Sequence, residues 1–440
     1  MDLSLLLSPN LRHQSRLAAA RQQAAPPSAA ELAARQLRGI AQSWAAATAD
    51  IPYYESLVKS GAAPAQVRAW SDVAAIPPLT RQALQDAPDA FLRRSRPPAS
   101  MMITAGSTGT PLRMGMGGAE RDLMRVVKLA EWQRLGYTPG SRLFLIWGHS
   151  HLLGTGWRRQ YLHVRRKLAD AFLGYRRVDA YRLNRADCEA HARTMLEFKP
   201  IGIIGYASVL DLFARYTTAY RARFRALGLR FVLSTAEAPP RPDTIPLIED
   251  HFGCPVVEEY GGAEFGQVAF KSGPDAFRVY GDLNFVECDE PAGADAGGGA
   301  ALVTSLYDRY LPLVRYRVGD LLARPQRLAH GHVASFEAVA GRINDVIHLA
   351  DGEAIHSVAV FHCIHQEPAV KNIQMVLRDD AIDICLVTLA TDRLALEARL
   401  RQRLTQVHPA LARARFVYGE DVHASRAGKR RWFVDLRTPR

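Results

Sequence analysis

The sequence contains few cysteines, and their spacing excludes two common structural devices. Its 440 residues include 5 Cys, an odd number, with no CxxC pair. A disulfide framework is indicated by an even number of cysteines, and a zinc ribbon needs closely spaced pairs. We therefore predict neither, and we expect the thiols to be buried or incidental. These residues are Cys188, Cys254, Cys288, Cys363 and Cys385.

Long apolar runs are also lacking. No segment approaches the ~20 apolar residues that cross a bilayer. The apolar patch at residues 3–7 is too short for a signal peptide and lacks its basic flank. A composition of 48% hydrophobic and 23% charged residues is typical of a folded globular protein. We expect a cytoplasmic protein without a membrane partner, either a monomer or a homodimer.

Recognised nucleic-acid-binding motifs are absent, although the formal net charge is +12. The positive charge comes mostly from arginines that are spread along an Ala/Arg-rich chain. A basic surface without such a motif still attracts anionic ligands and acidic partners. We predict no nucleic-acid partner and favour nucleotides, CoA or an acidic acyl carrier protein as the anions that this chain receives.

The pattern of apolar residues predicts a large domain followed by a small one. Residues 11–50 have loosely helical spacing, and Thr80 is placed to cap a short helix. We therefore expect a mostly helical entry region over residues 1–100. Between about 100 and 340, short apolar runs alternate with helical stretches, which indicates α/β layers. The pattern restarts near Gly341 as strand, turn and helix. We predict a layered α/β domain over 1–340 and a small α+β domain over 341–440. The apolar runs are Leu143–Trp147, Gly202–Gly205, Phe231–Ser234, Val256–Glu258 and Ala301–Thr304.

A loop rich in serine, threonine and glycine is the most informative local motif. It runs from Thr104 to Pro111 as TAGSTGTP. Glycines let consecutive N–H groups point inward around a phosphate, and the hydroxyls add donors. A surface turn has the same composition, so the loop alone leaves both interpretations open. It is not a Walker loop, because GxxxxGK[ST] is absent.

Four further motifs follow, each of which also suits an ordinary turn or a solvated charge. In the first, an aromatic residue precedes two glycines and a carboxylate lies four residues after it. This order suits a purine beside a magnesium ion. In the second, an aspartate follows a glycine at a strand end, which suits a ribose diol. The motifs are Glu259–Gly266 (EYGGAEFG), Leu313–Asp320 (LVRYRVGD), Gly341–Asp345 (GRIND) and Gly428–Lys429.

Together and in this order, the five motifs resemble those of the adenylate-forming superfamily of acyl-CoA synthetases, adenylation domains and luciferases. Within it the chain looks most like the phenylacetate-CoA ligase and capsular-polysaccharide-associated ligase branch. The short length, the segment Ile51–Tyr54 (IPYY) and the LVRYRxGD motif indicate that branch. The resemblance covers the chain from about residue 50 onward. It implies an AMP-binding domain over 1–340 and a mobile C-terminal lid domain over 341–440.

The resemblance also implies a nucleotide site, residue by residue. Tyr260 would stack on adenine, Asp320 would hold the ribose hydroxyls, and Arg342 would support the ribose or phosphate at a hinge. Glu264 would help to bind Mg²⁺, and Lys429 would reach the carboxylate and the α-phosphate. The phosphate loop would include Thr104, Gly106, Ser107, Thr108, Gly109 and Thr110. The remaining nucleotide contacts would be Ala236, Glu237 and Gly261.

Several positions depart from the family pattern. Ala263 replaces the usual threonine before the motif glutamate, Asn344 replaces the hinge aspartate, and Ala236 replaces a glycine. Where some relatives carry zinc-binding cysteines, this chain has Lys271 and Ser272. We therefore expect no structural zinc.

The same resemblance suggests an acid pocket with aromatic walls, suited to a planar or aryl acid. Packing in the core explains the aromatic residues equally well. Basic residues also crowd between Arg158 and Arg185. That run is either a solvated helix face or a surface that receives an anionic substrate, CoA or a carrier protein. The predicted pocket residues are Trp147, His149, His151, Gly154, Tyr206 and Gly262.

The expected chemistry is activation of a carboxylic acid by ATP as an acyl-adenylate, followed by transfer to CoA. Three alternatives remain open at this point. The acceptor could be an amine or a carrier-protein thiol, the substrate could be an acid other than a carboxylate, or the chain could be a nucleotide-binding scaffold that has lost catalysis. Retention of Glu264, Asp320 and Lys429 argues against the scaffold.

Overall fold

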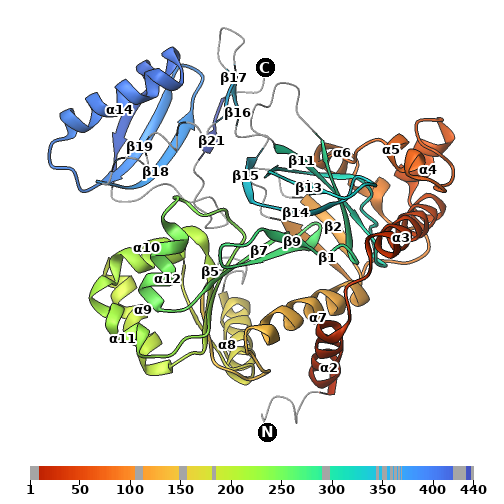
Figure 1. Cartoon of the computed structure of the whole chain (residues 1–440), viewed down its shortest axis with the longest axis horizontal. Helices are drawn as coiled ribbons and strands as arrows, with labels where there is room; N and C mark the ends of the chain where they lie inside the picture. Colours follow the sequence, from red (N-terminus) through yellow and green to blue (C-terminus); the bar gives the residue numbers. More distant parts are fainter. Residues whose placement is uncertain are drawn as a thin grey trace. The chain divides into compact units, whose positions relative to one another are not determined.

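The computed structural model describes residues 9–104, 112–147, 156–180, 185–289, 298–342, 346–348, 354–356, 360, 364, 367, 369–419 and 433–437. Contacts divide the chain into two compact units, Met1–Val339 and Ala340–Arg440. The ribbon follows the chain through both units (Figure 1), and each unit is described by itself below.

The first hundred residues are mostly helical. Ser28 and Glu31 form a capping box at the start of α3 (Ala29–Asp50). Thr80 caps α6 (Arg81–Asp86) by accepting from the N–H of Ala83, so the predicted cap is confirmed. The other helices of this region are α2 (Pro9–Gln23), α4 (Pro52–Lys59) and α5 (Trp70–Ala75).

A nine-stranded sheet forms the centre of the first unit, in the order β13-β14-β9-β8-β7-β6-β5-β3-β4. The pairs from β4 through β7 are parallel, and those beyond β7 are antiparallel. The parallel strands are β3 (Leu143–Ile146), β4 (Tyr175–Val178), β5 (Gly202–Tyr206), β6 (Phe231–Thr235) and β7 (Val256–Gly262). The others are β8 (Gly266–Ser272), β9 (Phe277–Val279), β13 (Gln326–Arg327) and β14 (Val333–Phe336).

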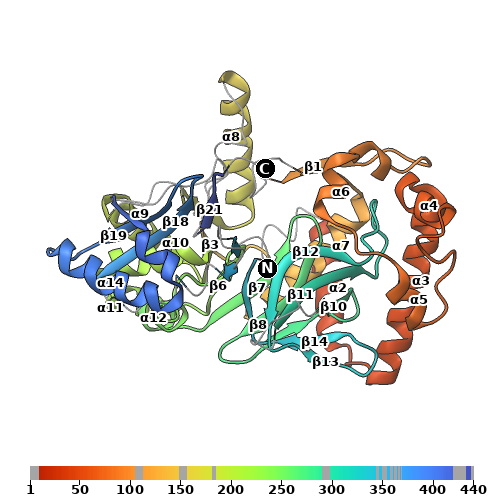
Figure 2. The same ribbon diagram turned by 90° about the horizontal axis from the view of Figure 1, so that it is seen from above.

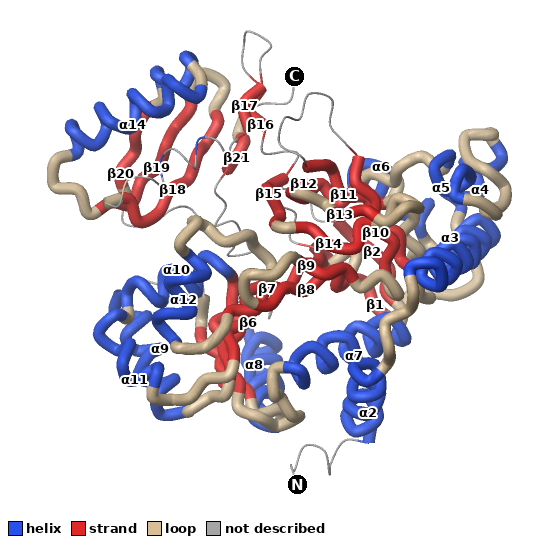
Figure 3. The backbone as a smooth tube through the Cα atoms, in the orientation of Figure 1, coloured by secondary structure: helices blue, strands red, loops and turns tan. Residues whose placement is uncertain are grey.

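Alternation along these strands produces two apolar faces, as a strand period of two requires. Phe144, Ile203 and Val232 pack into one core with helices on their side of the sheet. Leu145 and Leu233 face the opposite core. The tube drawing shows helices on both sides of the sheet (Figure 3). The first core includes residues of α9 (Arg185–Phe198), α10 (Ala207–Tyr216), α11 (Arg221–Arg225) and α12 (Thr244–Phe252), and the second includes residues of α2 and α7 (Gly118–Arg134).

A smaller sheet joins the N-terminal helices to the rest of the unit. Its order is β10-β11-β12-β15, and β1 pairs with β2 in a separate hairpin. The Tyr54 hydroxyl donates to the Pro312 carbonyl over 2.8 Å, and Leu79 forms a parallel bridge with Tyr316. Both tyrosines are almost fully buried. The strands are β1 (Ser100–Thr104), β2 (Leu112–Met116), β10 (Asn284–Asp289), β11 (Gly298–Ser305), β12 (Tyr316–Ala323) and β15 (Ala338–Arg342).

The second unit is a small α+β domain. Leu396, Leu400 and Leu404 recur at helical spacing on α14 (Arg393–Val407), and all three are buried in one core with the sheet. That sheet has the order β20-β19-β18-β21, and β16 pairs with β17 in a hairpin. These strands are β16 (Val346–His348), β17 (Ala354–His356), β18 (Val370–Leu377), β19 (Ile382–Thr388), β20 (Arg415–Tyr418) and β21 (Phe433–Asp435). The predicted fold class, a large layered α/β domain and a small α+β domain, is confirmed.

Two buried histidines predict a loss of stability in acid. Burial, and then the charge of Arg221, lower the pKa of His251 to about 4, and burial together with His330 lowers the pKa of His332 to about 4. In the unfolded chain each would titrate near ~6.5. The unfolded state then binds more protons, so the free energy of unfolding should fall as the pH drops from about 6.5 to 4, by up to ~3 kcal/mol per histidine.

Urea unfolding of His251→Gln at pH 7.5 and 4.5 measures this loss. The variant should lose less stability between the two pH values than the parent. The exposed His163→Gln is the control and should lose as much as the parent. An equal loss in all three proteins would contradict this role of His251.

Candidate active site

The carboxyl ends of the parallel strands bring several predicted positions to one edge of the large sheet. Tyr206 is the last residue of β5 and pairs in register with Thr235 of β6, which pairs with Glu259 of β7. Trp147 directly follows β3, and Ala236 directly follows β6. Ligands of open α/β sheets bind at this edge, because loops diverge there. The edge is therefore the candidate active site.

Trp147 and Tyr206 form an aromatic wall at this edge. Their ring centroids lie 4.2 Å apart, with 32° between the ring planes. Tyr206 is buried, and Trp147 is partly exposed. The two predicted pocket residues are thus in contact. The predicted residues His149, His151 and Gly154 lie outside the described residues.

The predicted adenine segment begins in an unusual backbone conformation. Ala236 has a φ of +69°, in the left-handed region that glycine adopts without a steric penalty. The next carboxylate, Glu237 Oε2, accepts from the hydroxyl of Ser208 over 2.6 Å and from its N–H over 3.3 Å. Ser208 lies in the first turn of α10, where a negative charge is favourable to the helix dipole. Glu237 therefore joins the loop after β6 to the start of α10.

Tyr260 and Asp320, predicted to bind the adenine and the ribose, are hydrogen-bonded to each other. The Tyr260 hydroxyl donates to Asp320 Oδ2 over 3.1 Å, and both residues are buried. The Tyr260 ring also packs edge-on against Phe336. Three residues of β12, from Val318 to Asp320, oppose a single residue of β11. This bulge orients Asp320 toward Tyr260, as bulges commonly re-aim a side chain.

The apolar run Val256–Glu258 covers only the first part of a longer strand. Strand β7 continues through Gly262 and pairs with β8, with a register shift at Tyr260 and Gly261. A Cβ at Gly261 would lie 2.4 Å from the carbonyl oxygen of Gly266, and one at Gly262 would lie 2.5 Å from the Phe265 ring. Close backbone packing by itself therefore requires glycine at 261, whereas a side chain at 262 would displace the Phe265 ring.

Glu264, the predicted magnesium ligand, is held by two arginines that lie outside the sequence motifs. Arg81 Nη1 lies 2.6 Å from Glu264 Oε1, and Arg309 Nη2 donates to the Glu264 carbonyl over 2.6 Å. The side chain of Glu264 is 13% exposed. No local signal marks Arg81, because it is 183 residues from Glu264 and directly follows a helix cap. A hard carboxylate oxygen with partial access to solvent fits one position in a Mg²⁺ coordination shell.

Glu259 of β7 is a second carboxylate, five residues before Glu264 in the sequence. Glu259 Oε2 accepts from Thr235 Oγ1 over 3.1 Å, and Lys128 Nζ lies 3.9 Å from it. Gln267 donates to the other oxygen. Glu259 therefore links β6, α7 and β8 under the edge. In the described part of the chain, no group of three or more His, Cys, Asp or Glu could hold a metal ion by itself.

Other predicted residues are only partly described. Thr104 ends β1 and pairs with Leu112 of β2, so residues 105–111 connect two adjacent strands. The predicted loop residues Gly106, Ser107, Thr108, Gly109 and Thr110, like Lys429, lie outside the described residues. Arg342 is the last residue of β15.

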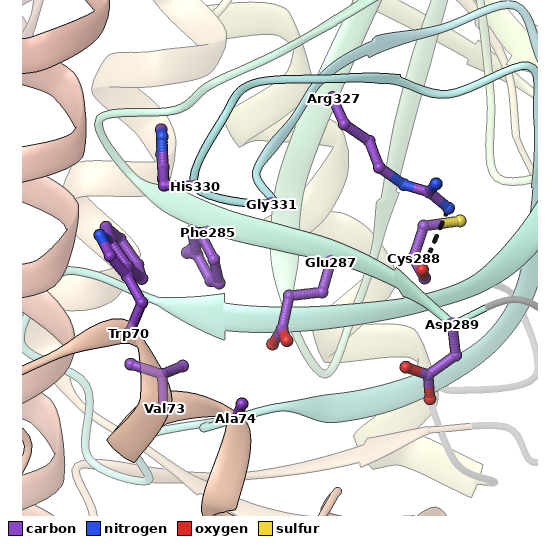
Figure 4. Close-up of a pocket in the computed structure, with 10 residues that line it drawn as sticks. All are labelled: Trp70, Val73, Ala74, Phe285, Glu287, Cys288, Asp289, Arg327, His330 and Gly331. Atoms are coloured by element: carbon purple, nitrogen blue, oxygen red, sulfur yellow. Dashed lines mark hydrogen bonds between the residues drawn. The ribbon is translucent and has the colours of Figure 1, made fainter.

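A separate pocket of about 260 Å³ lies beside α5 and β10, away from the predicted residues (Figure 4). The Trp70 and Phe285 rings stack in it, with centroids 5.2 Å apart. Its two carboxylates are already paired, Glu287 with Arg315 over 3.0 Å and Asp289 with Arg317 over 2.8 Å. Each carboxylate of this pocket therefore already has an arginine as its partner.

The fold is similar to that of solved adenylate-forming ligases. A structure of 2-hydroxyisobutyryl-CoA ligase in the postadenylation state matches with a TM-score of 0.68 and 18% identity over 94% of each chain. The same ligase with 2-HIB-AMP and CoA in the thioesterification state matches with a TM-score of 0.59 and 19% identity, again over 94% of each chain. IdnL7 matches with a TM-score of 0.50 and 15% identity over 76% of this chain and 65% of that one.

No protein-family model matches the sequence, and no curated protein is similar to it in sequence. The chain therefore has the fold of the adenylate-forming ligases, which confirms the resemblance of the motifs at the level of the fold.

The left-handed conformation of Ala236 predicts that Ala236→Gly stabilises the protein. Glycine removes the steric cost at this φ, and its larger entropy in the unfolded chain offsets part of that gain. We expect the free energy of unfolding to rise by up to about 1 kcal/mol. The control is Ala45→Gly, at an exposed position inside α3, which should lower it by about 1 kcal/mol. Urea unfolding measures both, and an equal loss in the two variants would contradict the strain at Ala236.

Proposed function

We propose that this protein is an ATP-dependent, AMP-forming ligase that activates a carboxylic acid as its acyl-adenylate and transfers the acyl group to CoA. The observation that carries the proposal is the hydrogen bond between Tyr260 and Asp320, with Glu264 in the turn that follows the strand of Tyr260. These three motif residues come from two distant segments, and the Tyr260–Asp320 hydrogen bond joins the segments in the fold of the adenylate-forming ligases. A scaffold that had lost catalysis would have no need of all three.

In the proposed reaction the carboxylate oxygen of the acid attacks the α-phosphorus of ATP, and the bond to pyrophosphate breaks. Both reactants are anions, so much of the barrier is electrostatic. Lys429 would neutralise charge where it develops, between the carboxylate and the α-phosphate. Mg²⁺, when bound, would neutralise phosphate charge. The thiol of CoA would then attack the acyl carbon, form the thioester and release AMP.

Asp320 and Tyr260 would act by positioning. In this structure the Asp320 carboxylate accepts from Tyr260 at one oxygen, which fixes its orientation relative to Tyr260. A preoriented carboxylate loses little entropy when it accepts hydrogen bonds from a ribose diol. Tyr260 is 7% exposed, so it would offer a small part of its ring to adenine.

The acid is proposed to be planar or aryl. The contact between Trp147 and Tyr206 supports this, because two rings 4.2 Å apart form a rigid apolar wall. The CoA acceptor is supported by the similarity in fold to a ligase whose structure contains both 2-HIB-AMP and CoA.

Lys429→Ala tests whether Lys429 neutralises the charge that develops during adenylation. The variant should release acid-dependent pyrophosphate ~10²-fold more slowly, the size expected for one group that stabilises a transition state. Thioester formation from pre-formed acyl-adenylate and CoA should stay near the parent rate. Equal damage to both half-reactions would remove Lys429 from the proposed role. Pyrophosphate release that depends on no acid in a broad panel of aryl, alkyl and amino acids would refute the proposed function itself.

Arg81 and Mg²⁺ would compete for the same carboxylate, and this predicts opposite effects for two variants. Glu264→Gln should raise the Mg²⁺ concentration that half-saturates ATP binding, because an amide is a poorer ligand for a hard cation. Arg81→Gln should lower it, because a positive charge beside the metal is removed. We expect each change to be about 5-fold, measured by calorimetric titration of ATP at several Mg²⁺ concentrations.

Glu258→Gln is the matched control, because Glu258 is a similarly buried carboxylate that pairs with Lys271 over 3.1 Å. It should leave the Mg²⁺ dependence unchanged. A rise in the half-saturating Mg²⁺ concentration in Arg81→Gln would mean that Arg81 supports the metal site and does not compete with it.

A further inference from the structure

Helix α8 (Gly156–Phe172) presents an apolar stripe to solvent. Tyr161, Val164, Leu168 and Phe172 are 59%, 55%, 67% and 40% exposed. Their spacing of three, four and four residues places them on one face of a helix. Exposed apolar residues that gather in one patch mark an interaction surface, whereas single ones are common.

Helix α8 is attached to the sheet through its polar face, whereas an ordinary surface helix packs on the sheet through its apolar face. On α14, leucines at a spacing of four are buried against the sheet. On α8, the described side chains take no part in either apolar core of the large sheet. Instead Asp170, on the side opposite to the stripe, accepts two hydrogen bonds from Arg177 of β4 over 3.0 and 3.1 Å. The polar face is thus anchored to the protein, and the apolar face points away from it.

The charges at the borders of the stripe restrict what can cover it. At 100° per residue, Arg165 borders the stripe on one side and Lys167 flanks it on the other, and both are exposed. Asp170 is the single acidic residue in the sequence of α8, and it lies on the opposite side. A second copy of α8 would bring cations against cations in either orientation. The complementary surface is therefore anionic.

We propose that α8 is an interfacial helix that binds the surface of an anionic lipid bilayer. Figure 2 shows that α8 projects from the sheet, and all four residues of its stripe are exposed. Aromatic and aliphatic side chains with flanking Arg and Lys are typical of helices that lie in the headgroup region. The stripe from Tyr161 to Phe172 is ~17 Å long, enough to lie in the interface and too short to cross the membrane.

This inference differs from the expectation of no membrane partner, which rested on the absence of long apolar runs. None of the described helices is long and apolar enough to span a bilayer. An interfacial helix needs no such length. It needs an amphipathic face with cations beside it, and a net charge of +12 adds long-range attraction to an anionic surface. The proposal is independent of the proposed reaction.

The test is flotation of the full chain with vesicles of phosphatidylcholine alone or of phosphatidylcholine and phosphatidylglycerol in equal amounts, at 50 and 500 mM NaCl. The parent should bind the mixed vesicles at least about 10-fold better than the neutral ones at low salt, and high salt should remove most of this preference. The double variant Val164→Gln/Leu168→Gln should lose about 10-fold in binding to mixed vesicles. Arg165→Gln/Lys167→Gln should lose the preference for anionic lipid.

The matched control is Leu389→Gln/Leu394→Gln, which replaces two leucines that are 70% and 81% exposed in the other unit. It should bind as the parent does. Circular dichroism and acid-dependent pyrophosphate release without vesicles check that each variant is folded. Vesicle binding that is unchanged in Val164→Gln/Leu168→Gln would overturn the proposal.

Two other results would also overturn it and would identify a different occupant. A parent dimer in light scattering that Leu168→Gln dissociates would show that a second copy covers the stripe. Absence of vesicle binding, together with a raised KM for an acyl carrier protein in Arg165→Gln/Lys167→Gln, would show that an acidic protein covers it.

Discussion

The turn between β7 and β8 depends on charged contacts from three segments that are remote in the sequence. Arg81 binds the Glu264 carboxylate from the N-terminal helical region. Arg309 binds the carbonyl of the same residue. In the strand before the turn, Tyr260 donates to Asp320 of the smaller sheet. These contacts hold the turn and its strand in one conformation. They therefore fix the positions of Tyr260, Glu264 and Asp320.

These contacts stabilise the turn because their partners are buried. Arg309 is 4% exposed, and it lies 4.0 Å from the equally buried Glu120 of α7. Glu120 in turn accepts from the N–H of Tyr310 over 2.7 Å. Removing one partner of such a network leaves a charge without compensation in the interior, which costs several kcal/mol, whereas an exposed pair contributes little. The network therefore resists rearrangements that would separate the Glu264 turn from Arg309 and α7.

The N-terminal helices take part in the candidate site through the same contacts. Leu79 forms a bridge with Tyr316, four residues before Asp320 in the strand that carries it. Arg81 follows two residues after Leu79 and reaches Glu264. The sequence marks this region only as helical, yet the region places the Arg81 guanidinium beside Glu264, the proposed magnesium ligand. Arg315, which belongs to the same motif as Asp320, donates from its guanidinium to the Ala74 and Ile76 carbonyls and so joins the motif to the N-terminal helical region.

The sequence by itself determined the two-domain α/β class, the apolar strands and the order of the motifs. Strand alternation, helix caps and glycine-rich turns are local properties, and they need only neighbouring residues. The motifs also indicated that Tyr260 and Asp320 belong to one site. The hydrogen bond between them could not be predicted from the sequence. Only the tertiary structure decided that Arg81 and Arg309 hold Glu264, that β7 continues through Gly262, and that the apolar face of α8 points away from the protein. Side chains far apart in the chain meet only after the strands have paired, and whether an apolar face is buried depends on what packs beside it.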